Sequence, residues 1–367
     1  MSGIFGTFCN SIHTQDKNKN KLILWNNAYG RDAKQIFEKN NIQIGCCLQM
    51  LATHTTTSPI LHMNSMYAAI DLLLYNREEL IIKCNAPTSI SDEELLLSYL
   101  TQFGMSALKD VNGDFSGVIY DENAQTLTLF RDHMGIRPLY YYADNSFMAF
   151  STDIRGLLGL DGVDSSLNED WIYRTLSGYF VDSVTSTEYQ NIFCVSPASY
   201  ITFSIKNEKI SQEIHSYWQL GKKKIHYTSF ELYKAKLKEL VTDSIQRRLQ
   251  AIPGKAGAEL SGGLDSGVIG ILIHRLGRDC VYFSWSVDPN EIPYADHDER
   301  LIIKDICKQE HIQCHYSQMK SDRSMNSLLA RQMQSLGFSL DENEPPALRY
   351  AMPPYINAMA LCDSCSC

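Results

Sequence analysis

Residues 257–267 read GAELSGGLDSG, and this stretch decides the fold of the second half of the chain. Small and apolar residues ending at Leu260 predict a strand, and the glycines that follow break it. A helix is predicted from about Ser266 to Leu276, and a second strand from Cys280 to Val287. This order of elements predicts a parallel sheet with a right-handed crossover, which binds ligands at the carboxyl ends of its strands.

The turn between the first strand and the helix has the composition of an anion site. Gly262 and Gly263 let the backbone approach a phosphate, and the following helix directs its free N–H groups and positive dipole end at it. Ser261 and Ser266 add hydroxyl donors. Asp265 would repel a phosphate unless a divalent cation lay between them, and Mg²⁺ prefers oxygen ligands. The turn therefore predicts an ATP and Mg²⁺ site; the alternative is an ordinary glycine-rich turn that caps a helix.

The first half of the chain is rich in short strands. Four are predicted, at residues 115–120, 126–131, 139–142 and 147–151, because aromatic and β-branched residues alternate with turn residues, and we interpret them as an antiparallel meander. A helix is predicted after the capping residue Ser91. Strands layered with helices predict an α+β domain.

A lysine-rich stretch beside Gly221 marks the join between the two halves. We expect a domain over residues 1–205, a linker over residues 206–228 and a second domain over residues 229–367. Thr228 and Glu231 fit a capping box at the start of a helix, whose apolar residues recur at helical spacing.

Length, charge and cysteine content narrow the class of protein. A chain of 367 residues with a net charge of −9 predicts two folded domains and argues against general binding to nucleic acid or a membrane surface. The longest apolar runs are far shorter than a membrane span, and the cytoplasm is the expected location. The eleven cysteines are expected to be thiols, with Cys46 and Cys47 packed in a core, and a metal on Cys362, Cys365 and Cys367 is disfavoured because a fourth ligand is missing.

Several segments together resemble the asparagine synthetase family. The turn at residues 261–266 looks like the PP-loop of ATP pyrophosphatases, and residues 3–6, 113–115 and 130–141 look like the glutaminase half of that family. The Tyr217-Trp218 pair and the Phe283-Ser284 strand occur in the same order as in the family. The resemblance implies an N-terminal αββα sandwich of the Ntn type and a C-terminal α/β domain of the adenine nucleotide alpha hydrolase type.

The resemblance also implies which residues bind the nucleotide. It places ATP against residues 260–266, which include Leu264, with Leu260 and Trp285 beside the adenine, although core packing explains these two side chains as well. Asp265 is the implied catalytic and metal-binding residue. The implied chemistry is adenylation of a carboxylate, aspartate by family default, followed by attack of an amine. Family members are often dimers, so a homodimer is the expected assembly.

The glutaminase half departs from the family at three points. Family members carry an N-terminal Cys nucleophile where this chain has Ser2, whose hydroxyl is far less acidic than a thiol. The Asn-Gly pair that donates to the oxyanion is replaced by Asp71-Leu72, which brings a negative charge. The Arg that holds the glutamine carboxylate is replaced by His54, and Asp92 alone matches a glutamine-amine contact. We predict that glutaminase activity is absent or vestigial.

The ATP half departs as well. The family carries a later Ser-Gly-x-Gly-x-Asp-Glu segment and a catalytic Lys, and this chain ends in Cys-Asp-Ser-Cys-Ser-Cys without them, so we expect a truncated domain. Three hypotheses remain: an asparagine synthetase-like ligase, a lasso-peptide cyclase or β-lactam synthetase-like ligase, and an inert fragment or pseudoenzyme. Among other local features, Asp296, Asp298 and Glu299 are interpreted as helix caps rather than a substrate loop, and the histidines at positions 311 and 315 as surface residues.

Overall fold

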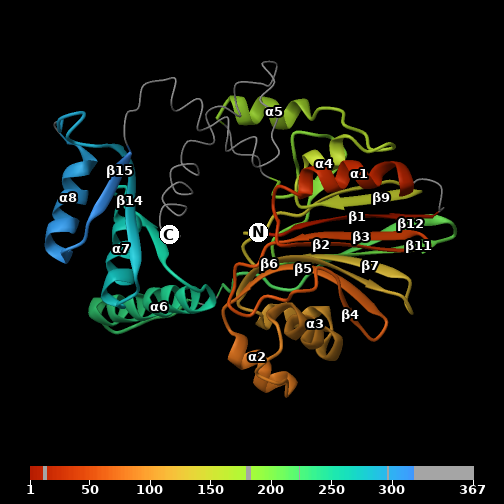
Figure 1. Ribbon diagram of the computed structural model, residues 1–367, viewed down its shortest axis with the longest axis horizontal. Helices are drawn as coiled ribbons and strands as arrows, with labels where there is room; N and C mark the ends of the chain where they lie inside the picture. The colour runs from red at the N-terminus through yellow and green to blue at the C-terminus, as the bar shows by residue number, and fades with distance from the viewer. Residues whose placement is uncertain (11–14, 179–182, 223, 296, 318–367) are drawn as a thin grey trace. The chain divides into compact units, whose positions relative to one another are not determined.

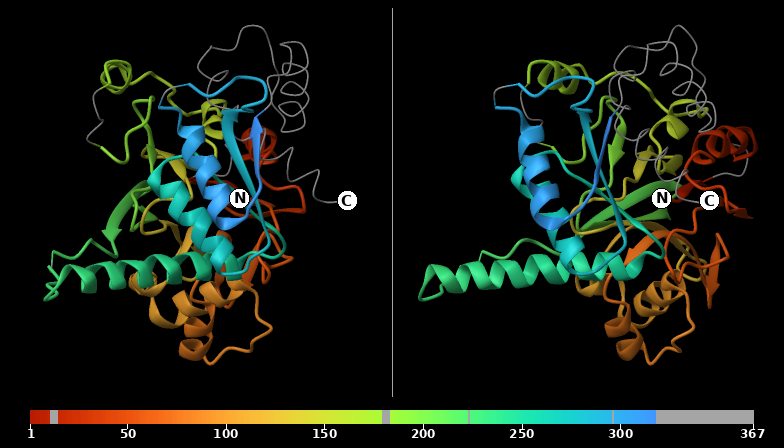
Figure 2. Two further views of the ribbon diagram at one scale, coloured as in Figure 1. Left: turned by 90° about the vertical axis from the view of Figure 1, so that its left-hand side faces the viewer. Right: turned by 60° about the vertical axis from the view of Figure 1, so that its left-hand side comes forward.

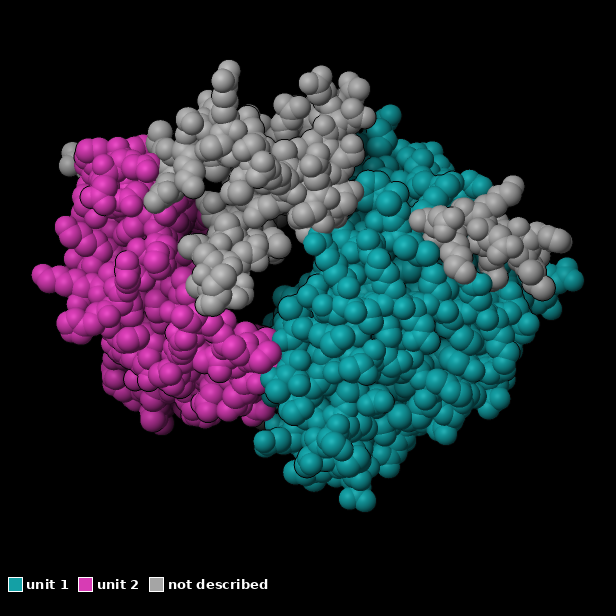
Figure 3. All heavy atoms as spheres, viewed as in Figure 1, with its two compact units in different colours: residues 1–223 teal, residues 224–367 magenta. Residues whose placement is uncertain are grey.

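The computed structural model describes residues 1–10, 15–178, 183–222, 224–295 and 297–317. Two compact units make up the chain, residues 1–223 and residues 224–367 (Figures 1 and 3). In the described part of the chain, none of the helices combines the length and the apolar character that crossing a bilayer requires.

Two six-stranded antiparallel sheets form the centre of the first unit. The strand orders are β10-β8-β9-β1-β3-β2 in one sheet and β12-β11-β7-β6-β5-β4 in the other. The strands are β1 (Gly3–Cys9), β2 (Ala33–Lys39), β3 (Ile42–Leu48), β4 (Leu61–Met63), β5 (Met66–Leu74), β6 (Gly113–Asp121), β7 (Thr126–Arg131), β8 (Tyr140–Ala143), β9 (Phe147–Ser151), β10 (Ile192–Cys194), β11 (Ser199–Lys206) and β12 (Lys209–Ser216).

Helices cover the outer faces of both sheets, which gives four layers (Figure 1). Helices α1 (Gln15–Asn26) and α4 (Arg155–Leu158) cover one sheet, and α3 (Asp92–Phe103), with α2 (Arg77–Cys84) packed on it, covers the other. Helix α5 (Glu169–Leu176) has no buried residue. Strand β1 shows how the layers are held: Ile4 and Phe8 belong to the core between the sheets, while Phe5 and Cys9 pack under α1 and α4. Alternate side chains of a strand point to opposite faces, so one strand supplies two cores.

Most predicted elements of the first unit are present, but the meander is wrong. Strands β6 and β7 pair with each other in one sheet, whereas β8 and β9 pair in the other. The change of sheet takes place after Asp132, whose carboxylate accepts hydrogen bonds from the backbone N–H groups of Met134, Ile136 and Arg137. Helix α3 begins as predicted, with a capping box between Ser91 and Glu94.

The first unit continues beyond residue 205. Strand β12, which lies in the segment predicted as linker, pairs along the whole of β11. After it, Tyr217 is buried, and its hydroxyl donates a 2.7 Å hydrogen bond to the carbonyl oxygen of Arg131.

The second unit contains a three-stranded parallel sheet in the order β13-β14-β15. Its elements are α6 (Phe230–Ala251), β13 (Ala256–Glu259), α7 (Leu264–Arg275), β14 (Cys280–Val287), α8 (Glu299–Glu310) and β15 (Cys314–Ser317). Helices α7 and α8 lie side by side along the sheet (Figures 1 and 2). Their Ile273 and Ile303 pack with Tyr282 of β14, so the predicted strand, helix, strand unit is confirmed.

Helix α6 differs from its prediction in two respects. Its N-cap is Ser229, whose hydroxyl accepts a hydrogen bond from the N–H of Leu232, rather than Thr228. Only Ile245 of its apolar residues is buried, and Phe230 and Leu237 are exposed. The predicted apolar face therefore packs only in its second half.

Eight cysteines lie in the described part of the chain, and all are free thiols. Cys46 and Cys47 on β3 are buried, which confirms the prediction of core packing. Burial raises the pKa of the Cys47 thiol to about 11, so neither an easily oxidised nor a nucleophilic thiolate is formed there. The candidate cysteines at positions 362, 365 and 367 lie outside the described residues.

Candidate functional site

The glycine-rich turn lies where sequence placed it, between the carboxyl end of β13 and the start of α7. Gly263 is the N-cap of α7, and Asp265 lies in the first helical turn. The first N–H groups of a helix have no acceptor within the helix, and they are the donors with which helix starts bind anions. Strand β14 runs parallel to β13, so its own carboxyl end lies at the same edge of the sheet.

Hydrogen bonds between the two serines hold the turn closed. The hydroxyls of Ser261 and Ser266 lie 2.8 Å apart, and the Ser266 hydroxyl also accepts from the N–H of Ser261 at 3.1 Å. The N–H of Gly263 donates to the Ser261 hydroxyl at 3.3 Å. These bonds hold the bend of the backbone before α7 begins.

Gly262 is required by the geometry of the turn. Its φ of +83° is a conformation that side chains disfavour, and a Cβ at this position would lie 2.6 Å from the carbonyl oxygen of Glu299. The turn is therefore packed against the first residue of α8.

The other predicted nucleotide residues differ in exposure. Asp265 is exposed and Leu264 is 81% exposed, so both are accessible to a ligand. Leu260 is fully buried in a core cluster with Ile273, and an adenine contact by Leu260 would have to come from its backbone. Trp285 is half-buried on β14 and makes an edge-to-face contact with Phe283.

The acidic cluster after β14 contains a helix cap, as predicted. Asp298 is the N-cap of α8 and accepts from the N–H of Arg300. Hydrogen bonding to the Arg300 guanidinium holds the pKa of the Asp298 carboxyl well below its usual range. His311 and His315 are exposed, which confirms the interpretation as surface residues, and Asp296 lies outside the described residues.

Ser2, the predicted position of the nucleophile, lies beside the buried ion pair of Asp71 and Arg137. Ser2 is buried at the start of β1, and its backbone N–H donates a 2.7 Å hydrogen bond to Asp71. The other oxygen of Asp71 lies 3.4 Å from Nε of Arg137 in a buried ion pair. The hydroxyl of Ser2 accepts from the N–H of Gln49 at 3.1 Å. The Asp71 carboxylate, which the resemblance places at the oxyanion site, is thus paired with the guanidinium of Arg137, 66 positions later in the chain.

The predicted glutamine-binding residues are also engaged with other protein groups. Asp92 forms an ion pair with Arg77, and the N–H of Asp92 donates to the carbonyl oxygen of His54. Burial raises the pKa of the Asp92 carboxyl even though Arg77 acts in the opposite direction. Beside it, Glu93 accepts a 2.8 Å hydrogen bond from the N–H of Thr56, and burial raises the pKa of Glu93 to about 7.

This arrangement offers little to a glutaminase reaction. A tetrahedral oxyanion needs hydrogen-bond donors, and Asp71 presents a carboxylate in their place. Sequence reasoning missed Arg137 and Arg77 as the partners of the two aspartates, because no local spacing links residues that meet only in the folded sheet.

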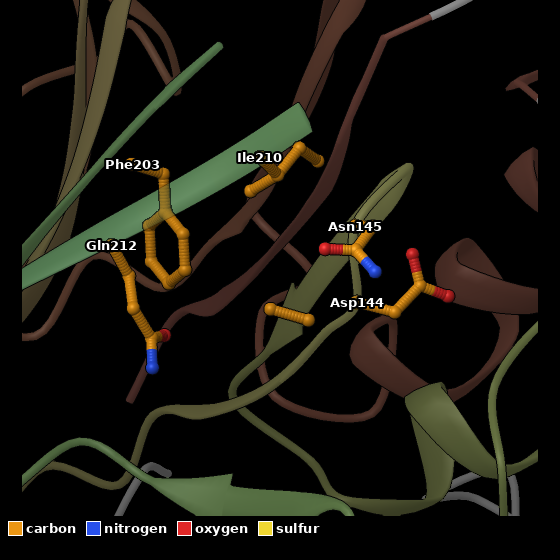
Figure 4. A pocket seen from close by; sticks show the side chains of 6 residues that line it. Asp144, Asn145, Phe203, Ile210 and Gln212 are labelled. Atoms are coloured by element: carbon orange, nitrogen blue, oxygen red, sulfur yellow. The ribbon is translucent and has the colours of Figure 1, made fainter. Parts of the chain in front are cut away.

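Two surface pockets lie away from these residues. One, of about 290 Å³, is lined by residues of the β8–β9 turn and the β11–β12 hairpin, including Asp144, Phe203 and Gln212 (Figure 4). Cys9 at the far end of β1 pairs with Phe147 just after that turn, so this pocket lies at the opposite end of the strand from Ser2. The other, of about 380 Å³, lies at the amino ends of β13, β14 and β15 and includes Lys255 and Arg278. Neither pocket contains a predicted site residue.

Comparison with known families places both units. Residues 1–218 match the family described as glutamine amidotransferase domain, and residues 236–355 match the family described as asparagine synthase. The chain belongs to the asparagine synthetase family. Its first unit is accordingly an Ntn-type αββα sandwich and its second an α/β domain with a parallel sheet, as predicted.

The relatives of this asparagine synthetase family member include enzymes of archaea, bacteria and fungi. It is 28% identical over 248 residues to putative asparagine synthetase (glutamine-hydrolyzing) 2 of Methanocaldococcus jannaschii, covering 65% of this chain and 46% of that protein. It is 29% identical to asparagine synthetase (glutamine-hydrolyzing) 3 of Bacillus subtilis, covering 58% of this chain and 33% of that protein. It is 30% identical to amidase chry2 of Gibberella zeae, covering 51% of this chain and 27% of that protein.

The chain spans less than half the length of these relatives. Among solved structures it is similar to the glutamine phosphoribosylpyrophosphate amidotransferase of B. subtilis, at 10% identity and a TM-score of 0.42, covering 92% of this chain and 89% of that one. At family level the chain is related to ATP-dependent amidotransferases and ligases, and the asparagine synthase domain is an ATP-using domain.

Proposed function

We propose that the second unit binds ATP with Mg²⁺ at residues 260–266 and that the protein is an amide-forming ligase. In this proposal the carboxylate of aspartate attacks the α-phosphate, pyrophosphate leaves, and an amine attacks the resulting acyl-adenylate. Asp265 would hold Mg²⁺ against the phosphates, and the N–H groups at the start of α7 would bind them. Trp285 remains the proposed neighbour of the adenine.

The observation that carries the proposal is the geometry of the turn. Gly262 takes a left-handed φ of +83° and Gly263 caps α7 at the carboxyl edge of a parallel sheet, and Asp265 lies exposed in the first turn of that helix. An ordinary helix cap needs neither the exposed carboxylate nor the left-handed glycine. Binding of a phosphate through Mg²⁺ would use the exposed carboxylate, and the glycine lets the backbone turn sharply before α7.

The test is direct measurement of Mg·ATP binding by titration calorimetry. We expect the unaltered chain to bind and Asp265→Asn to bind at least about tenfold more weakly, because the carboxylate charge that holds Mg²⁺ is lost. Asp279→Asn, on the loop before β14, is the matched control and should bind as the unaltered chain does. Equal affinity of the Asp265 variant and the control would overturn the proposed site.

A second candidate function is favoured by the first unit. Ser2, Asp71 and Arg137 form a paired cluster where a glutaminase needs a nucleophile and oxyanion donors. The amine would then come from solution or from the substrate itself, as in a lasso-peptide cyclase or β-lactam synthetase-like ligase. ATP–pyrophosphate exchange with aspartate favours the first candidate, whereas exchange with other carboxylates alone favours the second.

A third candidate, an inert fragment or pseudoenzyme, predicts no exchange with any carboxylate. Homodimer formation, a cytoplasmic location and the lack of nucleic-acid and membrane partners stay predictions. Sedimentation of the purified chain tests the dimer.

A further inference from the structure

Arg300 uses all of its donors inside the protein. It lies in the first turn of α8 and is only 8% exposed. Its guanidinium donates to the carbonyl oxygens of Val287 (2.8 Å), Ile292 (2.9 Å) and Pro293 (3.1 Å), and to both oxygens of Asp298. A guanidinium has five N–H donors, and this set of acceptors accounts for every one.

These acceptors all belong to the connection between β14 and α8. Val287 is the last residue of β14, Ile292 and Pro293 lie in the irregular segment that follows, and Asp298 caps α8. The ring of Tyr294 from the same segment lies 5.4 Å from the guanidinium. One buried side chain therefore fixes the path of this connection and the place where α8 begins.

The start of α8 is in turn the support of the glycine-rich turn. Gly262 fits so closely against Glu299 that a Cβ would lie 2.6 Å from the Glu299 carbonyl oxygen. A small shift of the α8 start changes that contact. The directions of the neighbouring N–H groups would change with it, and anion binding depends on those directions.

We propose that Arg300 is a positioning residue of the nucleotide site. It holds the first turn of α8 against Gly262, and through that contact it keeps the turn in the shape that binds phosphate. The proposal rests on the proposed function of the turn, since it names what sets the shape of that same site. Arg300 contacts only protein groups, so its effect on the nucleotide is transmitted through α8.

Arg300→Lys tests the proposal, because Lys keeps the charge but lacks the planar fork. Arg275→Lys is the matched control: Arg275 is 60% exposed in the same unit and pairs with Glu310. Mg·ATP affinity is measured by calorimetry well below the melting temperature, with folding checked by circular dichroism. We expect affinity about tenfold weaker for Arg300→Lys and within about twofold of the unaltered chain for Arg275→Lys.

A second measurement follows the turn itself without nucleotide. Backbone hydrogen exchange of a peptide containing residues 261–266 should be at least about threefold faster in Arg300→Lys and unchanged in Arg275→Lys. A purely structural role would lower the melting temperature and leave both the affinity and this exchange rate unchanged. Either quantity remaining at its unaltered value would overturn the inference alone. Failure of the unaltered chain to bind Mg·ATP would overturn the proposed function, and the inference with it.

Discussion

Two regions of this molecule carry family motifs, and they use their polar groups in opposite ways. In the first unit, Asp71 is paired with Ser2 at the start of β1 and with Arg137, and Asp92 at the start of α3 is paired with Arg77. At the glycine-rich turn, Asp265 is exposed and the first N–H groups of α7 lack acceptors within the helix. A binding site needs polar groups that are not already satisfied by the protein, and only the second region presents such groups among these residues.

The largest effect is expected from Gly262→Ala. The added Cβ collides with the Glu299 carbonyl oxygen and φ is +83°, so the turn must move and Mg·ATP affinity should fall by about 100-fold. Gly277→Ala is the control, because it has a φ of +72° with nothing within 4 Å of the Cβ. Similar affinities of the two variants, measured by calorimetry, would show that the close contact is unimportant.

The next largest effect is expected on stability, when the positive charge of Arg137 is removed from the buried pair near Ser2. Arg137→Met leaves Asp71 buried without its partner, so the free energy of unfolding should fall by about 3 kcal/mol in urea titrations at neutral pH. Arg174→Met breaks an exposed pair with Asp170 and should cost less than about 1 kcal/mol. Equal losses would mean that the buried pair does not compensate the charge of Asp71.

A change of similar size and opposite sign is expected from Glu93→Gln. The folded-state pKa of Glu93 is raised from 4.5 to about 7, so the folded state binds the proton more tightly than the unfolded state does. The stability that this group contributes is complete below about pH 4.5 and is lost as pH rises to about 7. Glu93→Gln should remove that slope and raise the unfolding free energy at pH 8 by about 3 kcal/mol.

Urea titrations at several pH values check this prediction. The control is Glu78→Gln, which removes the same charge from an exposed position of the neighbouring helix α2. A slope that persists in the Glu93 variant, or disappears in the control, would assign the pH dependence to other groups.

The smallest effect is expected from Ser2→Cys. A thiol is the nucleophile type that the resemblance implies, but Asp71 still presents a carboxylate where the resemblance places the oxyanion donors. Glutamate release from glutamine should stay at the level of Ser2→Ala in a coupled assay. Glutamate release well above that level would show that the thiol alone is enough for glutamine hydrolysis and that Asp71 does not prevent it.

Local patterns predicted much of this fold, because they reflect short-range physics. The capping box at Ser91 and the glycine-rich turn at residues 261–266 depend on neighbours within a few positions, and both were found. The division of β6–β7 and β8–β9 between two sheets was missed, since strand pairing is a long-range choice. For the same reason the pairing of Arg137 with Asp71 carries no signal in the sequence.

Arg300 is a case between these extremes. Asp298, two positions before it, was predicted as a helix cap, but the hydrogen bonds between Asp298 and the Arg300 guanidinium were not predicted. The three carbonyl groups that Arg300 binds were not predicted either, because backbone acceptors are present at every position and only the folded chain selects among them.

The anchoring of Tyr217 has a practical consequence. Its N–H and hydroxyl tie the end of the first unit to Ala198 and Arg131, while Leu220 and Ile225 beyond it are exposed. Proteases cut where backbone is accessible and loosely held. Brief trypsin digestion at the lysines after Gly221 should therefore release the first unit as one resistant fragment, which could be purified without the other.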